Sequence, residues 1–348
     1  MGGYFSSKSS RTSGETITYN KTFTVFLMGA PKSGKSTIFR QLQLLSGVKI
    51  DDETRRQRRE DIRQYVLDAM TSILTAMPKL SPPVMLGSLQ SEIIARFVLD
   101  RTEFDGENLP KLFSLPNFIK TLWLDEGVQE AYRRGNEYDS ADNAPYFFVR
   151  IDRICRSDYL PSDEDLLRCP TLKVSPEHLD INPTIFNVQE SEVQDTTVRI
   201  VDHVTPPNRL PHFDIRRVSI VFVVDCSSYN ITSKTNPSKS QLQENFDYFE
   251  HLTTSRRGVS VHTILNKGDR LQEKILSGHK MEDHFPDFER FRCAGTDVVR
   301  ARDFIINKLE ISGSSSLTCA LDAEDIRSFF TDHIHAILTQ TVPFLDPK

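Results

Sequence analysis

The stretch from Gly29 to Thr37 constrains the fold of this chain more than any other part. Its sequence, Gly-Ala-Pro-Lys-Ser-Gly-Lys-Ser-Thr, matches the pattern G-x-x-x-x-G-K-[ST], in which a glycine-rich turn joins a buried strand to a helix. An apolar, β-branched run over 22–28 precedes it, and Ile38 and Leu42 follow at helical spacing. Because both flanking elements are present, we interpret the stretch as a phosphate-binding loop rather than as an ordinary glycine–serine turn.

The chemistry of such a loop depends on donors that converge on one phosphate. Successive backbone N–H groups and the N-terminus of the following helix surround the anion, and a lysine neutralises it. Here Lys35 is that lysine, and the hydroxyl of Ser36 can bind Mg²⁺. The loop residues expected to contact a nucleotide are Gly29, Lys32, Ser33, Gly34, Lys35, Ser36 and Thr37.

The order of the expected elements divides the chain into a sheet and an inserted helical block. Strands are expected at 22–28, 197–201, 218–224 and 259–265, with helices from near Lys35 and over 241–252, 298–309 and 326–338. Between about 52 and 155 the apolar residues recur only at helical spacing, with helices expected over 62–77, 89–99, 123–132 and 146–155. Prolines at 82, 83 and 110 are expected to break this block.

We therefore predict an α/β fold, a doubly wound sheet of the P-loop type interrupted by an all-helical domain. The expected boundaries are a flexible N-terminal tail at 1–20, the sheet domain at 21–50 and 170–348, and the helical domain at 51–169.

Composition excludes several other classes. The chain has 348 residues, 38% of them hydrophobic, which is enough for a full core. Its net charge of −5 gives no basic field that would favour nucleic acid as a ligand, and no apolar run approaches a membrane span of roughly 20 residues. The five cysteines are scattered and form no C-x-x-C pair, so we expect neither a disulfide framework nor a zinc site, and a reduced intracellular compartment.

A second motif selects the base. Asn266-Lys267-Gly-Asp269 follows an apolar strand and matches N-K-x-D. The Asp269 carboxylate can accept two hydrogen bonds from the amide and amino edge of guanine, which adenine does not offer in the same geometry. Cys319 and Ala320 follow another expected short strand, where a backbone N–H can meet the guanine oxygen. The motif favours guanine and argues against an ATP-dependent P-loop kinase.

Together these motifs and the helical insertion resemble the alpha subunits of heterotrimeric G proteins. The insertion carries the segments 123–138 and 165–168, and the resemblance spans roughly 22–340. It implies a GTPase-type signalling switch that binds GTP or GDP with Mg²⁺ at the cytoplasmic face of the plasma membrane. It also implies a G-protein coupled receptor, an effector and a βγ dimer as partners.

The resemblance assigns further site residues. Nucleotide contacts are implied at Asn143, Leu167, Arg168, Cys319 and Ala320. Asp142 is implied to lie near Lys267, the alternative being an ordinary loop residue. For Mg²⁺ it implies Ser36 and Asp202, with either Thr171 or Thr184 as a further ligand.

The chain departs from the family where hydrolysis is performed. Pro170 holds the position of the catalytic arginine, Pro206 that of the glutamine that orients water, and Thr205 that of a glycine. An arginine finger alone is worth about 10³–10⁵ in rate. No catalytic residue is intact, and Lys32 and Arg168 are the candidates left. We therefore predict impaired GTP hydrolysis, the alternative being a guanine nucleotide-binding scaffold that does not hydrolyse at all.

Lys32 is a second departure. The family has a glutamate here that pairs with the missing arginine, so both partners of that ion pair are absent. We hypothesise that the Lys32 ammonium points towards the phosphates and replaces part of the lost charge. The alternative is a lysine that faces solvent.

The two ends carry the remaining predictions. Met1–Ser6 fits M-G-x-x-x-[ST] and predicts myristoylation of Gly2, which by itself gives only marginal membrane binding; the alternative is an unmodified tail. The segment before the first strand is short and not amphipathic, which argues against contact with a βγ dimer. Pro343 and Pro347 prevent continuation of the last helix, and a receptor contact is left to Phe344 and Leu345.

Overall fold

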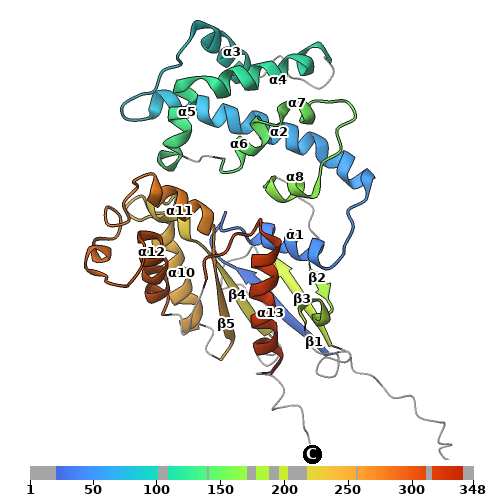
Figure 1. The fold of residues 1–348 in the computed structure, drawn as a ribbon, viewed down its shortest axis with the longest axis vertical. Coiled ribbons are helices and arrows are strands. Elements are labelled where there is room, and N and C mark those ends of the chain that lie inside the picture. Colours follow the sequence, from blue (N-terminus) through green and yellow to red (C-terminus); the bar gives the residue numbers. More distant parts are fainter. Residues whose placement is uncertain are drawn as a thin grey trace, which may run out of the picture.

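The computed structural model describes residues 21–100, 109–138, 141–170, 178–187, 196–202, 218–255, 258–310 and 316–339. These residues form a sheet covered by helices and a separate helical bundle stacked on one end of it (Figure 1). The chain enters the bundle after α1 (Lys35–Leu45) and leaves it after α8 (Asp163–Arg168), and these two helices lie against each other where the two bodies meet (Figure 1).

The sheet is mostly parallel and has the strand order β2-β3-β1-β4-β5. Its strands are β1 (Lys21–Met28), β2 (Leu179–Ile181), β3 (Thr196–Asp202), β4 (Val218–Asp225) and β5 (Ser260–Asn266). β1 pairs in parallel with both β3 and β4, β4 pairs in parallel with β5, and only β2 runs antiparallel, at the edge. The carboxyl ends of four strands therefore meet at one edge, where polar loops can converge.

Helices cover both faces of the sheet. α1 and α13 (Ala323–Thr339) pack on one face, against Val221 and Val223 of β4. α10 (Gln241–Ser255), α11 (Gly268–Leu276) and α12 (Asp297–Lys308) belong to the core on the other face, which includes Ile220 and Phe222. Every residue of β4 is buried, as expected for a central strand between two helical layers. The predicted doubly wound sheet with an inserted helical domain is confirmed.

The helical bundle surrounds one long central helix. Its helices are α2 (Asp52–Ala76), α3 (Leu89–Asp100), α4 (Leu109–Leu124), α5 (Glu126–Arg133), α6 (Ala144–Phe148), α7 (Ile151–Ile154) and α8. The apolar stripe of α2, including Ile62, Val66 and Met70, forms the centre of the core. Asp51 caps α2 by accepting from the Thr54 N–H at 2.7 Å. Short 3₁₀ turns are η1 (Met77–Lys79), η2 (Gly135–Glu137), η3 (Pro183–Phe186), η6 (Cys226–Asn230) and η7 (Pro286–Arg290).

Several expected elements were placed wrongly. The single helix expected over 146–155 is two short helices, α6 and α7, and the one expected over 123–132 divides at Asp125, which caps α5. Pro110 does not break the block; it lies in the first turn of α4, where a missing N–H costs nothing. The short strand expected before Thr318 is, among the described residues, a single bridge between Leu265 and Leu317.

No helix in the described part of the chain combines the length and the apolar character that a membrane span requires.

Candidate functional site

The loop between β1 and α1 curls tightly enough to face a phosphate with its backbone. Gly29, Lys32 and Gly34 have φ angles of 141°, 64° and 104°. A Cβ on Gly29 would lie 2.2 Å from the carbonyl oxygen of Val223, and one on Gly34 would lie 2.1 Å from Nδ2 of Asn266. Glycine is therefore required at both positions by the close approach of β4 and β5 as well as by the backbone conformation.

Lys35 extends back into this loop. Its Nζ donates to the carbonyl oxygens of Gly29 at 2.9 Å and Ala30 at 2.8 Å. Burial lowers the pKa of Lys35, and the Asp202 carboxylate partly opposes this shift. The hydroxyl of Ser33 is buried and has no hydrogen-bond partner in the described part of the chain, whereas Ser36 is exposed at the start of α1. The loop therefore holds a cation and donors that a phosphate could use.

Asn266 connects the phosphate loop to the other segments that we expect to contact guanine. Its Nδ2 donates to the carbonyl oxygen of Ser33 at 2.7 Å, and its Oδ1 accepts from the N–H of Ala320 at 2.9 Å. The N–H of Gly268 also donates to the carbonyl of Thr318 at 3.0 Å. Three segments that are distant in sequence are thus held together by hydrogen bonds at the carboxyl edge of the sheet.

A small cavity of about 70 Å³ lies beside these contacts. Its lining residues are Gly34, Thr37, Asp142, Asn143, Asn266, Lys267, Asp269, Arg270, Cys319, Ala320 and Leu321. Asp269 is exposed, so its carboxylate is accessible to a ligand in this cavity. The N–H groups of Cys319 and Ala320 already donate within the protein, to Asp325 and Asn266, so a bond from either to guanine stays a prediction.

Lys267 joins the two bodies of the molecule. Its Nζ lies 2.8 Å from Oδ2 of Asp142 in the bundle and 2.8 Å from Oδ2 of Asp225 at the end of β4. Arg270 adds a hydrogen bond of 2.6 Å to the carbonyl of Asp142. Burial favours the neutral acid, but the charges of Lys267 and Arg270 outweigh it and hold the pKa of Asp142 below its usual range. The structure thus places Asp142 beside Lys267.

The segment that leaves the bundle is held from α1. The buried guanidinium of Arg40 donates through Nη1 to the carbonyls of Leu166 at 2.6 Å and Cys169 at 2.7 Å. Asn143 Nδ2 donates to the carbonyl of Arg168 at 2.8 Å. These bonds fix the backbone that leads to Pro170.

Comparison with known proteins identifies the family. The family model described as G-protein alpha subunit matches residues 6–338. The chain is 33% identical over 347 residues to the guanine nucleotide-binding protein G(s) subunit alpha of Lymnaea stagnalis, covering 91% of this chain and 88% of the relative. It is 32% identical to the G(olf) subunit alpha of Homo sapiens, covering 91% and 87%. The chain belongs to the G-protein alpha subunit family.

Two of the predicted magnesium ligands, Ser36 and Asp202, lie at the start of α1 and at the end of β3. Oδ1 of Asp202 is buried without a hydrogen-bond partner among the described residues. The described residues contain no group of three or more His, Cys, Asp or Glu that could hold a metal. Mg²⁺ commonly binds one or two protein oxygens and completes its shell with phosphate and water. Ser36 and Asp202 fit such a site.

Three other residues that were predicted to contact the nucleotide or Mg²⁺ make their described contacts with neighbouring protein groups: Thr184, Leu167 and Arg168. Thr184 is half-buried in η3, and its hydroxyl donates to Oδ1 of Asn182 at 2.9 Å. Leu167 is buried in α8, and the Arg168 guanidinium pairs with Glu164 at 3.1 Å and lies over the ring of Tyr146. Arg168 is thus engaged by the bundle. Gly2, Thr171, Thr205, Pro206, Phe344 and Leu345 lie outside the described residues.

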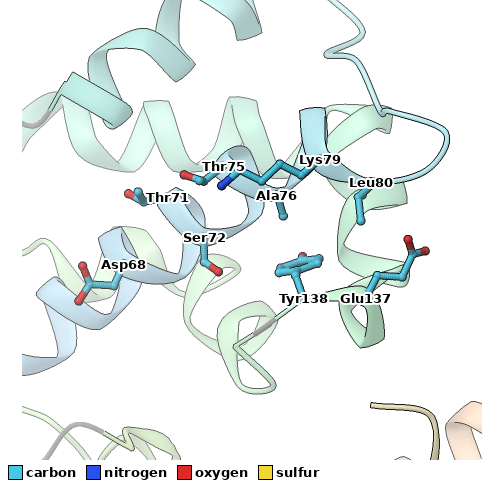
Figure 2. A pocket seen from close by; sticks show the side chains of 9 residues that line it. All are labelled: Asp68, Thr71, Ser72, Thr75, Ala76, Lys79, Leu80, Glu137 and Tyr138. Carbon is cyan, nitrogen blue, oxygen red and sulfur yellow. The ribbon is translucent and has the colours of Figure 1, made fainter. Parts of the chain in front are cut away.

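A larger hollow of about 470 Å³ lies in the bundle, away from the sheet edge. Figure 2 shows Asp68, Thr75 and Lys79 of α2 and η1 on one side and Glu137 and Tyr138 on the other. It has one lysine, two carboxylates and no glycine-rich turn, so it is poorly suited to a triphosphate.

Sequence reasoning missed three residues that organise the site: Arg40, Asp225 and Arg270. Asp225 had a usable signal, since it directly follows a buried strand whose carboxyl end must lie beside the phosphate loop. Arg40 had a weaker signal, because it is a charged residue between the apolar residues Phe39 and Leu42 of a helix expected to pack on the sheet. Nothing in the sequence indicated that the partners of Arg40 would be backbone carbonyls more than one hundred residues away.

Proposed function

We propose that this chain is a guanine nucleotide-binding signalling switch that takes GTP or GDP with Mg²⁺ and hydrolyses GTP very slowly. The observation that carries the proposal is a pair of hydrogen bonds at the Asn266 side chain, which donates to the carbonyl of Ser33 in the phosphate loop and accepts from the N–H of Ala320. Both Asn266 and Ala320 line the cavity that contains Asp269. Such an arrangement supports simultaneous recognition of a phosphate chain and a base. Family membership supports the guanine nucleotide as the ligand.

The residues of the loop would act by charge and hydrogen bonding. Lys35 would exchange its bonds to two loop carbonyls for bonds to phosphate oxygens, which are stronger because both partners are charged. The N-terminus of α1 would donate to the same anion. Ser36 and Asp202 would hold Mg²⁺, which supplies positive charge to the phosphates.

The catalytic step lacks its usual arginine. Pro170 follows α8 and is exposed, and a proline supplies neither a charge nor an N–H donor. Loss of an arginine finger alone lowers the rate by about 10³-fold or more. Pro206, at the position of the glutamine that orients water, lies outside the described residues. By sequence alone, this proline also predicts slow hydrolysis.

Nucleotide turnover on the purified full-length chain tests the proposal. We expect tight binding of GDP and of a non-hydrolysable GTP analogue, weak competition by ATP, and single-turnover GTP hydrolysis far below rates typical of the family. Lys35→Ala is a suitable negative control, since it removes the loop cation. Ordinary hydrolysis would refute the slow step, and equal competition by ATP would refute guanine selection.

A second candidate is a scaffold in which nucleotide holds the two bodies together without a cycle. The bonds from Lys267 to Asp142 and Asp225 favour it, because they join the bodies beside the proposed base site. Protease protection of residues 170–217 distinguishes the two. A switch requires different protection with GDP and with the GTP analogue, whereas a scaffold requires none.

We further propose attachment to the cytoplasmic face of the plasma membrane through a myristoylated Gly2. A receptor and an effector would be its partners, and the N-terminal sequence argues against a βγ dimer. Intact mass of the protein from its native cell tests the modification, and an unmodified N-terminal glycine would refute it.

A further inference from the structure

We propose that two copies of this chain associate through α3 at the outer end of the helical bundle, about a two-fold axis that makes the two helices antiparallel. Two features of α3 support this contact: an exposed apolar row and a pair of opposite charges beside that row. The association does not depend on the proposed function, because α3 lies at the end of the bundle away from the sheet and the candidate nucleotide site (Figure 1).

One face of α3 carries a continuous row of exposed apolar side chains. Leu89, Ile93 and Phe97 are 71%, 48% and 39% exposed and follow one another at steps of four residues. Side chains at this spacing lie on the same face of a helix, one above the next. The opposite face of α3, with Ile94 and Val98, is buried in the core of the bundle. The row is therefore a second apolar face, which the bundle itself does not cover.

Two neighbouring residues extend this row into a patch. The N–H of Gly87, just before α3, donates to both carboxylate oxygens of Asp125 at 3.0 Å. The segments that carry Met85 and Leu124 therefore lie together near the first turn of α3, where Leu89 begins the row. Met85 is 74% exposed and Leu124 is 80% exposed. Exposed apolar side chains that gather in this way mark an interface with another molecule.

A pair of opposite charges lies beside the apolar row. Glu92 and Arg96 are four residues apart, and the helical repeat places both along the same side of the row. Arg96 is exposed and Glu92 is half-buried. Among the described residues, neither side chain has an ion-pair partner. Both charges are therefore available to a partner that presents the opposite signs in the opposite order.

A second copy of α3 presents the charges in this order when it runs antiparallel. A two-fold axis perpendicular to both helices places Glu92 of each copy opposite Arg96 of the other. The midpoint of the charge pair lies within one residue, or about 1.5 Å along the helix, of Ile93 at the centre of the apolar row. One axis therefore matches the charges and the apolar row together. A parallel pair would bring like charges to the same level, which is unfavourable.

Sedimentation velocity on the full-length chain tests the association. One face of a single helix buries less than a standard interface, so we expect reversible dimers with a Kd of about 1–100 µM. Ile93→Glu places a charge at the centre of the row and should raise this Kd by more than about tenfold. Leu276→Glu is the matched control: Leu276 is 74% exposed on α11, and its replacement should leave the Kd unchanged. A wild-type chain that is still monomeric at about 200 µM would overturn the proposal and leave a different protein as the occupant of the row.

Charge reversal tests the antiparallel arrangement. Glu92→Arg and Arg96→Glu each place like charges opposite one another, so neither variant should associate with itself. Mixed in equal amounts, the two variants should form a heterodimer, because two cations of the first then face two carboxylates of the second. Thermal unfolding checks that each variant is folded. Dimers of either variant alone at the wild-type Kd, or a mixture that stays monomeric, would overturn the two-fold contact.

Discussion

The guanine end and the hydrolytic end of the proposed site are built in different ways. At the guanine end, Asn266 and Gly268 connect three segments through buried hydrogen bonds, and any one replacement disturbs several partners. The hydrolytic end of the family depends instead on single side chains that follow α8 and β3. Here two of those positions are Pro170 and Pro206. Under the proposed function, recognition that is distributed over a network persists, while hydrolysis, which depends on two side chains, is impaired.

The strongest test of this difference would restore the hydrolytic end alone. We expect Pro170→Arg combined with Thr205→Gly and Pro206→Gln to raise single-turnover GTP hydrolysis by about 10²-fold or more, since an arginine finger alone is worth about 10³–10⁵. Affinity for GDP should change little, because the network at Asn266 is untouched. The control variant carries Pro170→Ala instead of Pro170→Arg. Alanine removes the constraint that proline places on the backbone but adds no positive charge. An equal gain with alanine would show that the arginine has no part in it.

The next test would damage the guanine end alone. Asn266 is 1% exposed, so Asn266→Ala leaves the buried carbonyl of Ser33 and N–H of Ala320 without partners. We expect the free energy of unfolding to fall by about 2–4 kcal/mol and nucleotide affinity by more than about tenfold. Thermal unfolding with and without GDP measures both. The exposed Asn307→Ala should change stability by less than about 0.5 kcal/mol, and a similar loss there would contradict the prediction.

A smaller effect is expected where the guanine end meets the helical bundle. Lys267→Met leaves the carboxylates of Asp142 and Asp225 without their shared cation, and we expect GDP to dissociate about tenfold faster. The release of a fluorescent GDP analogue measures this rate. Adding Asp142→Asn removes one of the two carboxylates, so the double variant should be less impaired than the sum of the single ones. Strict additivity would show that the two residues do not act as a pair.

The smallest effect concerns pH. The ring of His262 on β5 packs edge-on against His333 of α13 at 5.0 Å, and burial with the charge of His333 lowers the pKa of His262 to about 4. The folded protein therefore favours the neutral ring, so this contribution to stability is complete above pH 6.5 and is lost as the pH falls towards 4. We expect a loss of about 1–2 kcal/mol across that window, with a shallower slope in His262→Gln. Denaturant unfolding at several pH values tests it, and identical slopes would exclude His262.

Elements with strong periodicity were predictable from sequence, and contacts between distant segments were not. The strands β1, β3, β4 and β5 lie within one or two residues of the expected ranges, because each is rich in β-branched residues. The helix α2 was predicted in type, but it begins at Asp52, ten residues before the expected start at Ile62, because residues 52–61 are all polar and add nothing to the apolar stripe. The edge strand β2 has only three residues and was missed, since so short a run contains no detectable period. The breaks at Asp125 and between α6 and α7 depend on caps and local packing, which compete with helix propensity over only one or two residues.

For the candidate site, too, local motifs were predictable from the sequence, and contacts between distant segments were not. Motif spacing predicted Lys35, Asn266 and Asp269, because nucleotide chemistry requires those residue types in that order. It could not predict that Arg40 would hold the backbone at Leu166, or that the amide of Ala320 would be engaged by Asn266. Those contacts arise only when the two bodies and the carboxyl edge of the sheet are assembled.

The bonds made by Asn266 also have a consequence for synthesis. Asn266 reaches back 233 positions to Ser33 and forward 54 positions to Ala320. During synthesis, the phosphate loop, the bundle and β5 are therefore all made before Ala320. Until then the cavity proposed for the base lacks part of its lining. The site closes only after residue 320 has emerged, and a prematurely terminated chain that ends before it would carry the loop without the pocket. If the chain binds nucleotide as proposed, retention of that nucleotide would report that synthesis had passed Ala320.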